Sequence, residues 1–386
     1  MKLRTLTVLM GVIVLGGALS MPTQAAQNAS SGIISFEVPG ADTTANDYNG
    51  TFPSGINNWE VVTGSYIDVN DVYHGFIRSP DGKFTTFEVR GADTTKGSYN
   101  GTIPNAINDL GWITGVYFDA SGTGHGFLLG PEGQFTAFDV PGAVGYSNPL
   151  AINLEGAVVG TYLDSNSVFR AFLRSPDGKF TTFLGPDGCN TSPAAGCFGT
   201  AAFNINIFGT IAAAYEDNSG NFVNVGLVRS PEGHVTPFEA PGAGAGSYQG
   251  TGCPGCALGL NQWGAIAGTY TDANNVFHGF LRGPEGGFTT FEAPGAGTGS
   301  NQGTGCFSDC SVSLNDLGTI AGIYIDANSI YHGFLRTIEG NFASVDPTGS
   351  EGTFPAGIND LQVVTGYYID ANNVYHGFLR IPSRFP

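Results

Sequence analysis

Short apolar runs recur along the whole chain, and glycine, proline, asparagine or aspartate bounds each of them. The runs are rich in β-branched and aromatic residues, as in Val61–Asp68, Tyr73–Arg78 and Lys83–Val89. This composition is typical of β-strands, and no run shows a convincing helical period. Strict alternation of apolar and polar residues is also weak, which predicts sheets that neighbouring sheets cover on both faces.

These runs belong to a unit that is repeated seven times. Each copy has an Ile-Asn or Leu-Asn pair, a β-rich run that ends in Tyr-x-Asp, and a His-Gly-Phe triplet or a degenerate form of it, as at Arg170 and Val225. The copies lie 44 to 55 residues apart. Each copy predicts four strands, which we name a, b, c and d in chain order.

Four strands in a repeat of this length are typical of a propeller blade, because a solenoid coil is shorter. The last copy stops after strand c at Arg380, whereas the segment Ile33–Gly40 matches a strand d with no a, b or c before it. We therefore predict an all-β fold, a seven-bladed β-propeller with four antiparallel strands per blade. In this fold the N-terminal strand completes the C-terminal blade, which closes the ring and hides two sheet edges.

The first segment has the features of a secretory signal. Lys2 and Arg4 precede an apolar run from Leu6 to Leu19, and small residues follow up to Ala26. Residues 1–26 are therefore interpreted as a signal peptide, and residues 27–386 as a single propeller domain. No later apolar stretch is long enough for a spanning helix, so we expect a secreted protein, extracellular or periplasmic, without membrane insertion.

Composition and charge narrow the classes of partner. The formal net charge is -18, and basic clusters that would bind nucleic acid or anionic membranes are missing. The motifs of serine hydrolases, zinc proteases and P-loop enzymes are also missing from the sequence. Turns such as Asp68–Asp71 carry oxygen ligands that calcium could use, but Asx turns explain them with fewer assumptions. We expect a monomer with no metal and no cofactor.

At the level of the repeat, the chain resembles the bacterial extracellular HAF repeats, which are named for a His-Ala-Phe triplet. The resemblance rests on Ile-Asn-Asp-x-Gly, Gly-x-Tyr-x-Asp and His-Gly-Phe-Leu, and it covers nearly all of residues 27–386. Glycine usually replaces the alanine of the triplet here, and only the third copy keeps it, at Ala171 behind Arg170. The resemblance implies propeller blades and no settled activity.

The histidines of the triplets occupy one strand position in successive copies, at His74, His125, His278, His332 and His376. Equivalent positions are spread around a ring, so these imidazoles cannot converge on one metal ion. We expect each to pair with the aspartate six residues earlier, such as Asp68 for His74, and to hold its blade together. Pleating puts His74, Phe76 and Arg78 on one face of strand c, which predicts a repeated Asp/His/Arg network.

The six cysteines form three local pairs in the segments that enter the fourth, fifth and sixth blades: Cys189 and Cys197, Cys253 and Cys256, Cys306 and Cys310. Secretion and an even count favour three disulfides within the d-a connections. A zinc site is the alternative for the Cys-x-x-Cys pair, but the distance along the chain to the next pair is too long for the usual spacing.

The d-a connections vary most between copies, and function tends to lie on variable loops that a rigid scaffold holds. Tyrosine beside an amide recurs in these loops and suits sugar hydroxyls, although Asn-Gly is also a simple turn signal. The candidate ligand-binding residues are Tyr48, Asn49, Tyr99, Asn100, Tyr146, Tyr248 and Gln249. In a propeller these loops share one face with the b-c turns.

Two functions fit these features. The first is a non-catalytic binding or scaffold propeller that engages a glycan or a cell-envelope protein through the d-a loops. The second is a propeller-fold polysaccharide lyase or glycoside hydrolase with acid and base residues at the mouth of the central channel. The regular repeat favours the first hypothesis. Departures from the repeat at Arg170, Ala213, Glu216 and Val225 keep the second one open.

Overall fold

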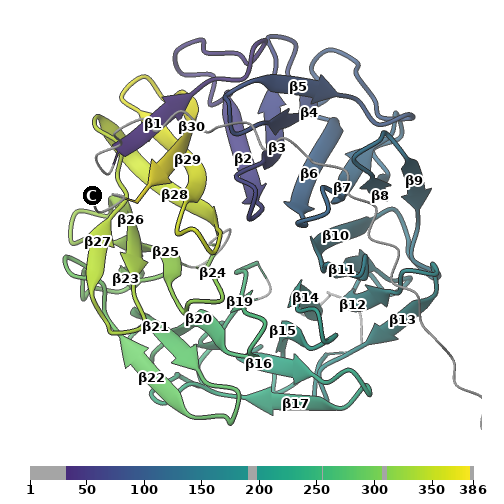
Figure 1. Cartoon of the computed structure of the whole chain (residues 1–386). Helices are drawn as coiled ribbons and strands as arrows, with labels where there is room; N and C mark the ends of the chain where they lie inside the picture. The colour runs from purple at the N-terminus through teal and green to yellow at the C-terminus, as the bar shows by residue number, and fades with distance from the viewer. Residues whose placement is uncertain (1–31, 190–197, 254, 307–310, 383–386) are drawn as a thin grey trace, which may run out of the picture.

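The structure is a computed structural model that describes residues 32–189, 198–253, 255–306 and 311–382. The described residues form strands and turns arranged as a ring of sheets around a central axis (Figure 1). The predicted signal peptide lies outside the described residues. Within the part of the chain that the structure describes, no helix has the length and apolar character needed to cross a membrane.

Strand pairing divides the described strands into seven antiparallel groups, each with strand a next to the axis and strand d on the outside (Figure 1). Blade 1 contains β2 (Thr51–Ile56), β3 (Val62–Ile67), β4 (Tyr73–Arg78) and β5 (Phe84–Phe87). Blade 2 contains β6 (Gly101–Ile107), β7 (Ile113–Phe118), β8 (Gly124–Leu129) and β9 (Phe135–Phe138). Blade 3 contains β10 (Ser147–Ile152), β11 (Val158–Leu163), β12 (Phe169–Arg174) and β13 (Phe180–Phe183). Blade 4 contains β14 (Thr200–Ile205), β15 (Ile211–Glu216), β16 (Asn224–Arg229) and β17 (Val235–Phe238).

In the next two blades strand a is split into two short pieces. Blade 5 contains β18 (Gly250–Thr251) and β19 (Gly259–Leu260), followed by β20 (Ile266–Thr271), β21 (Phe277–Arg282) and β22 (Phe288–Phe291). Blade 6 contains β23 (Gly303–Thr304) and β24 (Ser313–Leu314), followed by β25 (Ile320–Ile325), β26 (Tyr331–Arg336) and β27 (Phe342–Ser344). Blade 7 contains β28 (Ser350–Ile358), β29 (Val364–Asp370), β30 (Tyr375–Ile381) and, from the other end of the chain, β1 (Gly32–Phe36).

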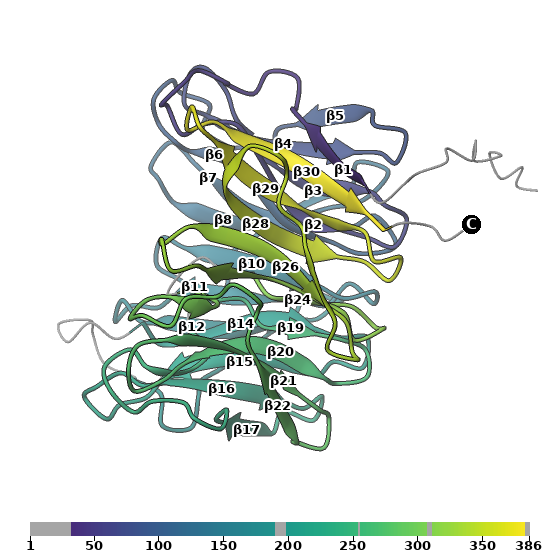
Figure 2. The same cartoon turned by 90° about the vertical axis from the view of Figure 1, so that its left-hand side faces the viewer.

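The N-terminal strand completes the C-terminal blade, as predicted. β1 pairs antiparallel with β30, so that Ile33 lies opposite Arg380 and Phe36 lies opposite Gly377 (Figures 1 and 2). His376 on β30 also contacts the carboxylate of Glu37, which follows β1. Two ends of the chain are therefore joined within one sheet, which removes two exposed sheet edges.

A closed ring of buried asparagines links the blades around the axis. In every blade the asparagine that follows strand a donates its side-chain N–H to the backbone carbonyl of the equivalent asparagine in the next blade, over 2.9–3.4 Å. The last of these bonds runs from Asn359 in blade 7 to Asn57 in blade 1 at 3.0 Å. The members are Asn57, Asn108, Asn153, Asn206, Asn261, Asn315 and Asn359, and all are buried.

A second set of contacts between blades needs glycine. Gly101 at the start of β6 pairs in parallel with Tyr73 of β4, and the N–H of Tyr73 donates to the carbonyl of Asn100 at 2.9 Å. Gly101 has a φ of 124°, and a Cβ built there would lie 2.0 Å from the carbonyl oxygen of Tyr73. Any side chain at this position would collide with the backbone of the preceding blade.

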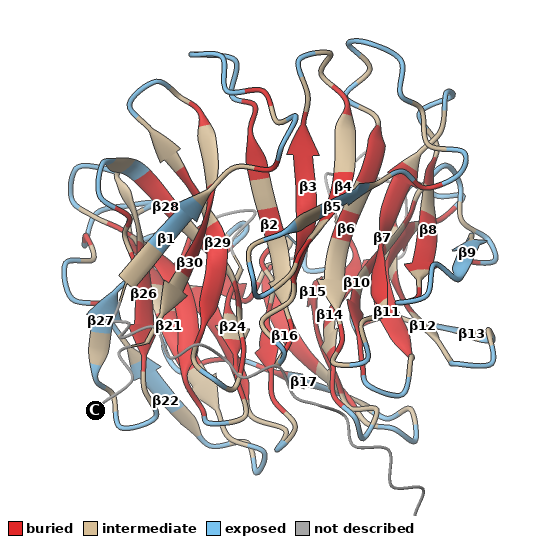
Figure 3. Cartoon of the chain, turned by 45° about the horizontal axis from the view of Figure 1, so that its top comes forward, coloured by how far each residue is buried: buried red, intermediate tan, exposed pale blue. Residues whose placement is uncertain are grey.

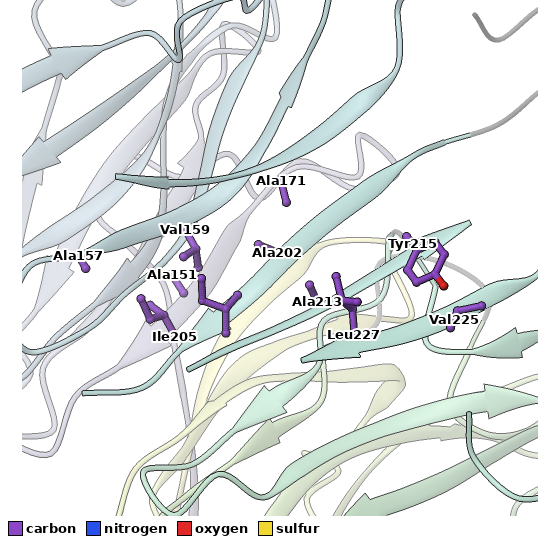
Figure 4. Packing of buried hydrophobic residues seen from close by; sticks show 11 residues of the cluster. Ala151, Ala157, Val159, Ala171, Ala202, Ile205, Ala213, Tyr215, Val225 and Leu227 are labelled. Carbon is purple, nitrogen blue, oxygen red and sulfur yellow. The ribbon is translucent and has the colours of Figure 1, made fainter. Parts of the chain in front are cut away.

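The hydrophobic core lies between the blades rather than at one central point. Between blades 3 and 4 the packing uses small residues such as Ala151, Ala202 and Ala213 beside Ile205 and Leu227 (Figure 4). Strands b are buried along their whole length in β3 and β15, whereas the outer strands d are half exposed (Figure 3). This explains the weak alternation in the sequence, because both faces of each inner strand are covered.

Candidate functional site

The d-a loops and the b-c turns share one face of the ring, which we call the loop face. The backbone N–H of Tyr99, in the loop that enters blade 2, donates to the carbonyl of Asp71 in the b-c turn of blade 1 at 2.9 Å. The N–H of Asn301 makes the equivalent bond to Asn275 at 2.7 Å. Neighbouring loops are therefore held to each other as a continuous rim, as expected for a propeller.

The structure places the candidate tyrosines Tyr48, Tyr99 and Tyr248 at equivalent positions of this rim. They are 55%, 52% and 39% exposed. Their φ angles are 57°, 52° and 61°, which lie in the left-handed region that bulky residues rarely adopt. In blade 6 the same turn is made by Asn301, at a φ of 61°. Asparagine tolerates this conformation far better, so the turn itself does not require tyrosine.

The neighbouring amides are used inside the loops. Asn49 is 2% exposed and donates to Asp42 at 3.2 Å and to Asp71 at 3.1 Å. Gln249 is also buried, and its amide donates to the side chain of Asn275 at 2.9 Å. The half-buried Asn100 donates to Asp93 at 3.1 Å. The structure therefore uses these amides to shape the loops. The rings stay partly exposed, with Tyr248 6.1 Å from Phe222 between ring centres and the hydroxyl of Tyr99 beside Asp71.

Tyr146 differs from the other candidate tyrosines. Its ring is half buried and stacks on Phe118, with the ring centres 6.2 Å apart, and it meets Phe169 edge to face at 5.9 Å. Burial raises the pKa of its hydroxyl. Tyr146 thus packs between blades 2 and 3, and the structure does not bring it to the exposed rim.

A central cavity of about 680 Å³ opens along the axis, walled by strands a. Aromatic side chains of Phe52, Tyr73 and Tyr367 line it, together with hydroxyl and amide groups such as those of Ser54 and Asn105. Among the described residues that line this cavity, none is aspartate, glutamate, histidine, lysine or arginine. Its wall can therefore offer apolar surface and neutral hydrogen-bonding groups.

Cys253, Cys256 and Cys306 lie within strand a of blades 5 and 6, which corrects their predicted place in the d-a connections. The described residues that follow these cysteine segments line the same cavity. The Cys253–Cys256 disulfide lies between β18 and β19, inside strand a of blade 5, and so excludes a zinc site at this pair. Ala257 and Leu258 follow it into the cavity wall. Cys189 and Cys306 are also disulfide-bonded, whereas the predicted partners Cys197 and Cys310 lie outside the described residues.

A length signal in the sequence marks these insertions. From the buried Thr51 at the start of strand a to Asn57 the chain advances six residues. From the equivalent Thr251 to Asn261 it advances ten, and from Thr304 to Asn315 it advances eleven. Extra residues within a fixed strand length must leave the sheet, and the described residues Ala257 and Ser311, which follow the extra cysteine segments, line the central cavity.

The triplet histidines lie between two carboxylates within their own blade. His74 is 3.4 Å from Asp68 through Nε2, contacts Glu88 through Nδ1, and stacks on Tyr66 with ring centres 4.9 Å apart. The hydrogen bond to Glu88 raises the pKa of His74, and the bond to Glu37 does the same for His376. A raised histidine pKa stabilises the fold at pH values below the ordinary histidine pKa. That stabilisation is lost as the pH rises through the raised pKa of the folded protein. The remaining pairs are His125 with Asp119, His278 with Asp272, His332 with Asp326 and His376 with Asp370.

The arginines form a different contact from the one predicted. The guanidinium of Arg78 lies over the ring of Phe36, which belongs to the preceding blade, with 5.1 Å from Cζ to the ring centre. The predicted Asp/His/Arg network therefore divides into an Asp/His contact within a blade and an Arg/Phe contact between blades. The equivalent pairs are Arg174 with Phe138, Arg229 with Phe183, Arg282 with Phe238 and Arg336 with Phe291.

Blade 4 departs from the repeat at a buried polar pair. Glu216 and Asn224 lie opposite each other on β15 and β16 and are 5% and 3% exposed. Burial raises the pKa of Glu216 to about 7, against the hydrogen bond from the backbone N–H of Phe198. In the described part of the chain, the side-chain oxygen of Asn224 has no hydrogen-bond partner. Neither residue is among the described residues that line the central cavity.

The other three departures from the repeat, at Arg170, Ala213 and Val225, also make contacts within the fold. Arg170 takes the place of histidine in blade 3 and contacts Asp164 through its Nε. Ala213 and Val225 belong to the apolar core between blades 3 and 4. In the described ranges no group of three or more His, Cys, Asp or Glu side chains is arranged to hold a metal ion.

No protein-family model matches the chain, and no curated protein sequence matches it. Solved structures do resemble it. A streptogramin B lyase is 16% identical, with a TM-score of 0.53 over 90% of this chain and 97% of the other. A catalytically inactive variant of virginiamycin B lyase from Staphylococcus aureus is 15% identical, with a TM-score of 0.55 over 91% and 100%. The BP39L lectin from Burkholderia pseudomallei is 9% identical, with a TM-score of 0.50 over 84% and 93%. At these identities the likeness establishes the fold, and the chain folds as a β-propeller.

Proposed function

We propose that the protein is a secreted, non-catalytic binding propeller that holds a glycan on its loop face. The observation that carries this proposal is the placement of Tyr48, Tyr99 and Tyr248. Each ring is exposed on a backbone in the left-handed conformation, although Asn301 makes the same turn in blade 6. Keeping tyrosine there costs conformational energy, of the order of 1 kcal/mol for each residue. A ligand contact is a physical reason to retain it.

The chemistry of the loop face and the cavity favours a neutral, hydroxyl-rich ligand. The face of an aromatic ring is electron-rich and attracts the C–H edges of a sugar ring. Hydroxyl and amide groups such as those of Ser54 and Asn105 exchange hydrogen bonds with sugar hydroxyls. Tyr48 and Tyr99 come from neighbouring loops, and Tyr248 comes from the other side of the ring. A glycan that bridges them would be an extended chain rather than a single sugar.

The catalytic alternative, a polysaccharide lyase or hydrolase, requires a pair of acid and base groups beside the bound sugar. The described lining of the central cavity has no carboxylate or imidazole, which favours binding without turnover. The buried carboxyl of Glu216 has the raised pKa expected of a general acid, but it is directed into blade 4. Both a lectin and lyases occur among propellers of this shape, so the fold does not decide between the two functions.

The test begins with a glycan array, followed by titration calorimetry with the best glycan. The variants are Tyr48→Asn, Tyr99→Asn and Tyr248→Asn, alone and combined, because each copies the turn that Asn301 already makes. We expect each single variant to lower affinity about tenfold and to melt at or above the temperature of the unmodified protein. Leu110→Ala, an exposed apolar residue on the opposite face, is the matched control and should bind normally.

Two results would overturn the proposal. Unchanged glycan affinity in the triple Tyr→Asn variant would remove the loop face as the binding surface. Release of reducing ends or of unsaturated sugars from any polysaccharide, by purified protein, would replace binding with catalysis. In that case Glu216→Gln would show whether blade 4 supplies the acid.

A further inference from the structure

The face opposite the loop face carries a ring of exposed apolar side chains. This turn face is built by the a-b turns and the c-d turns of the same blades, since a Cβ added at Gly111 would lie 3.3 Å from Pro131. The residue two positions after the ring asparagine is apolar in six of the seven a-b turns and is 51–69% exposed. These side chains, which we call the apolar ring, are Trp59, Leu110, Phe208, Trp263, Leu317 and Leu361.

The turn does not require these side chains. In blade 3 the same position is Glu155, and Asn153 still donates to the carbonyl of Asn206 at 3.0 Å and accepts from the N–H of Ala157 at 2.8 Å. Exposed apolar side chains that gather on one face of a soluble protein mark an interaction surface. The indoles are also fixed in place, because Trp59 donates to the carbonyl of Asp109 and Trp263 to that of Asp316, both at 3.0 Å.

The apolar ring surrounds a well of about 410 Å³ at the end of the central channel. Asp109, Asp316 and Asp360 line this well, and we call them the acidic well. The amide of Asn58 donates to Asp109 at 3.0 Å and to Asp360 at 2.9 Å. Burial raises the pKa of Asp316, and the nearby charges of Asp360 and Asp109 add to it. Three carboxylates so close together give the well a negative charge, although each also accepts a backbone N–H at 2.8 Å.

Outside the apolar ring the c-d turns carry charges of both signs, because strand c ends in an arginine whose guanidinium donates to the first carbonyl of the turn in five blades. The lysines of these turns, Lys83 and Lys179, are already paired with Asp81 and Asp177 at 2.5 and 2.6 Å. The other c-d turns carry Glu132, Glu232, Glu285 and Glu339. The turn face thus combines an acidic centre, an apolar ring and a margin of mixed charge.

We propose that the turn face is a docking surface for a cationic, amphipathic protein segment. A lysine or arginine of the partner would enter the acidic well, and apolar side chains on either side would contact the apolar ring. Charge complementarity selects this occupant, because a second copy of this chain or an anionic lipid would bring like charge to the surface. A neutral glycan would leave the carboxylates without a counter-charge. The inference does not depend on glycan binding at the loop face.

The probe is a synthetic leucine/lysine amphipathic peptide. Two controls are a leucine/glutamate peptide of the same pattern and a glycine/serine/lysine peptide of the same charge. Trp59 and Trp263 are two of the three tryptophans of the chain, so intrinsic fluorescence reports on this face directly. We expect saturable binding of the leucine/lysine peptide only, with a blue shift of the emission and an affinity that falls with salt.

Variants separate the two parts of the surface. Asp109→Asn with Asp360→Asn should lower affinity at least tenfold and reduce the salt dependence. Leu110→Glu with Leu317→Glu copies the polar residue of blade 3, so it should fold normally and should also lower affinity at least tenfold. The triple Tyr→Asn variant of the loop face should bind the peptide normally, which keeps this test independent of glycan binding.

Several outcomes would overturn the inference. Equal binding of all three peptides, or normal binding by the folded Leu110→Glu, Leu317→Glu variant, would show that the apolar ring is not used. Binding of the leucine/glutamate peptide would remove charge complementarity. Self-association that ultracentrifugation detects and that the same variant abolishes would identify a second copy as the occupant.

Discussion

Replacing Asn359 by alanine tests the ring of asparagines at the point where the chain closes on itself. Asn359 is 4% exposed. Its side chain donates to the carbonyl of Asn57 at 3.0 Å and accepts from the backbone N–H groups of Leu361 at 3.1 Å and Val363 at 2.9 Å. The alanine variant loses all three bonds and leaves a carbonyl and two N–H groups without these partners.

The cost follows from these three contacts. A hydrogen bond within a folded protein contributes about 1 kcal/mol net, and a buried group left unpaired costs more. We therefore expect Asn359→Ala to lower the free energy of unfolding by about 3 kcal/mol. For a domain of this size that corresponds to a melting temperature roughly 4 °C lower. Asn206→Ala should cost less, because its side-chain N–H lies 3.4 Å from the carbonyl of Asn261.

Urea unfolding followed by circular dichroism, together with calorimetry, measures the effect. Asn328→Ala is the matched control, since Asn328 is exposed on a b-c turn and, among the described residues, its side-chain and backbone N–H groups donate to Asp326 of the same turn. It should change stability by less than about 0.5 kcal/mol. Equal stability of the Asn359→Ala and Asn328→Ala variants would refute the view that the ring holds the blades together.

Three further perturbations address other parts of the structure. Glu216 has a pKa of about 7 in the fold against an ordinary 4.5, so the folded protein keeps a proton that the unfolded chain releases, and stability should fall as pH rises between these values. The free energy of unfolding from urea curves should decline between pH 4.5 and 7, with Glu216 contributing at most about 1.4 kcal/mol per pH unit, and Glu216→Gln should remove that contribution; an unchanged slope would contradict the assignment. Gly101→Ala places a Cβ against the carbonyl of Tyr73 and should cost about 3 kcal/mol, whereas Gly349→Ala, which meets nothing within 4 Å, should cost about 1 kcal/mol; calorimetry that ranks them otherwise would be evidence against the close approach. Arg282→Met should cost about 1 kcal/mol through the lost contact with Phe238, and a melting temperature equal to that of the unmodified protein would remove this contact as a stabilising feature.

The repeat made most of the fold predictable from the sequence. Turn residues and β-rich runs recur with each copy, and the unmatched strand at residues 33–40 indicated how the ring closes. Local signals of this kind depend on neighbours in the chain. The contact of Arg78 with Phe36 depends instead on the angle between two blades, which no single copy contains. The alternation of side chains along strand c correctly predicted the face on which Arg78 lies. It gave no information on which residue of the neighbouring blade Arg78 contacts.

The candidate site was less predictable for a related reason. The motif of tyrosine beside an amide identified the loops, but the exposure of each side chain depends on the b-c turn of the neighbouring blade. Asp71 binds the amide of Asn49 and the backbone of Tyr99, and its carboxylate also interacts with the hydroxyl of Tyr99. The apolar ring of the turn face was present in the sequence as the second residue after the ring asparagine in every blade except blade 3. Its exposure became evident only when the turns were placed around one axis.

Hydrogen–deuterium exchange with the glycan selected on the array tests the assignment of binding to the loop face most directly. We predict slower exchange in residues 42–49, 93–100 and 242–249, with no change in the a-b turns at residues 57–61, 108–112 and 315–319. Protection of those turns, with unchanged exchange in the d-a loops, would contradict the account.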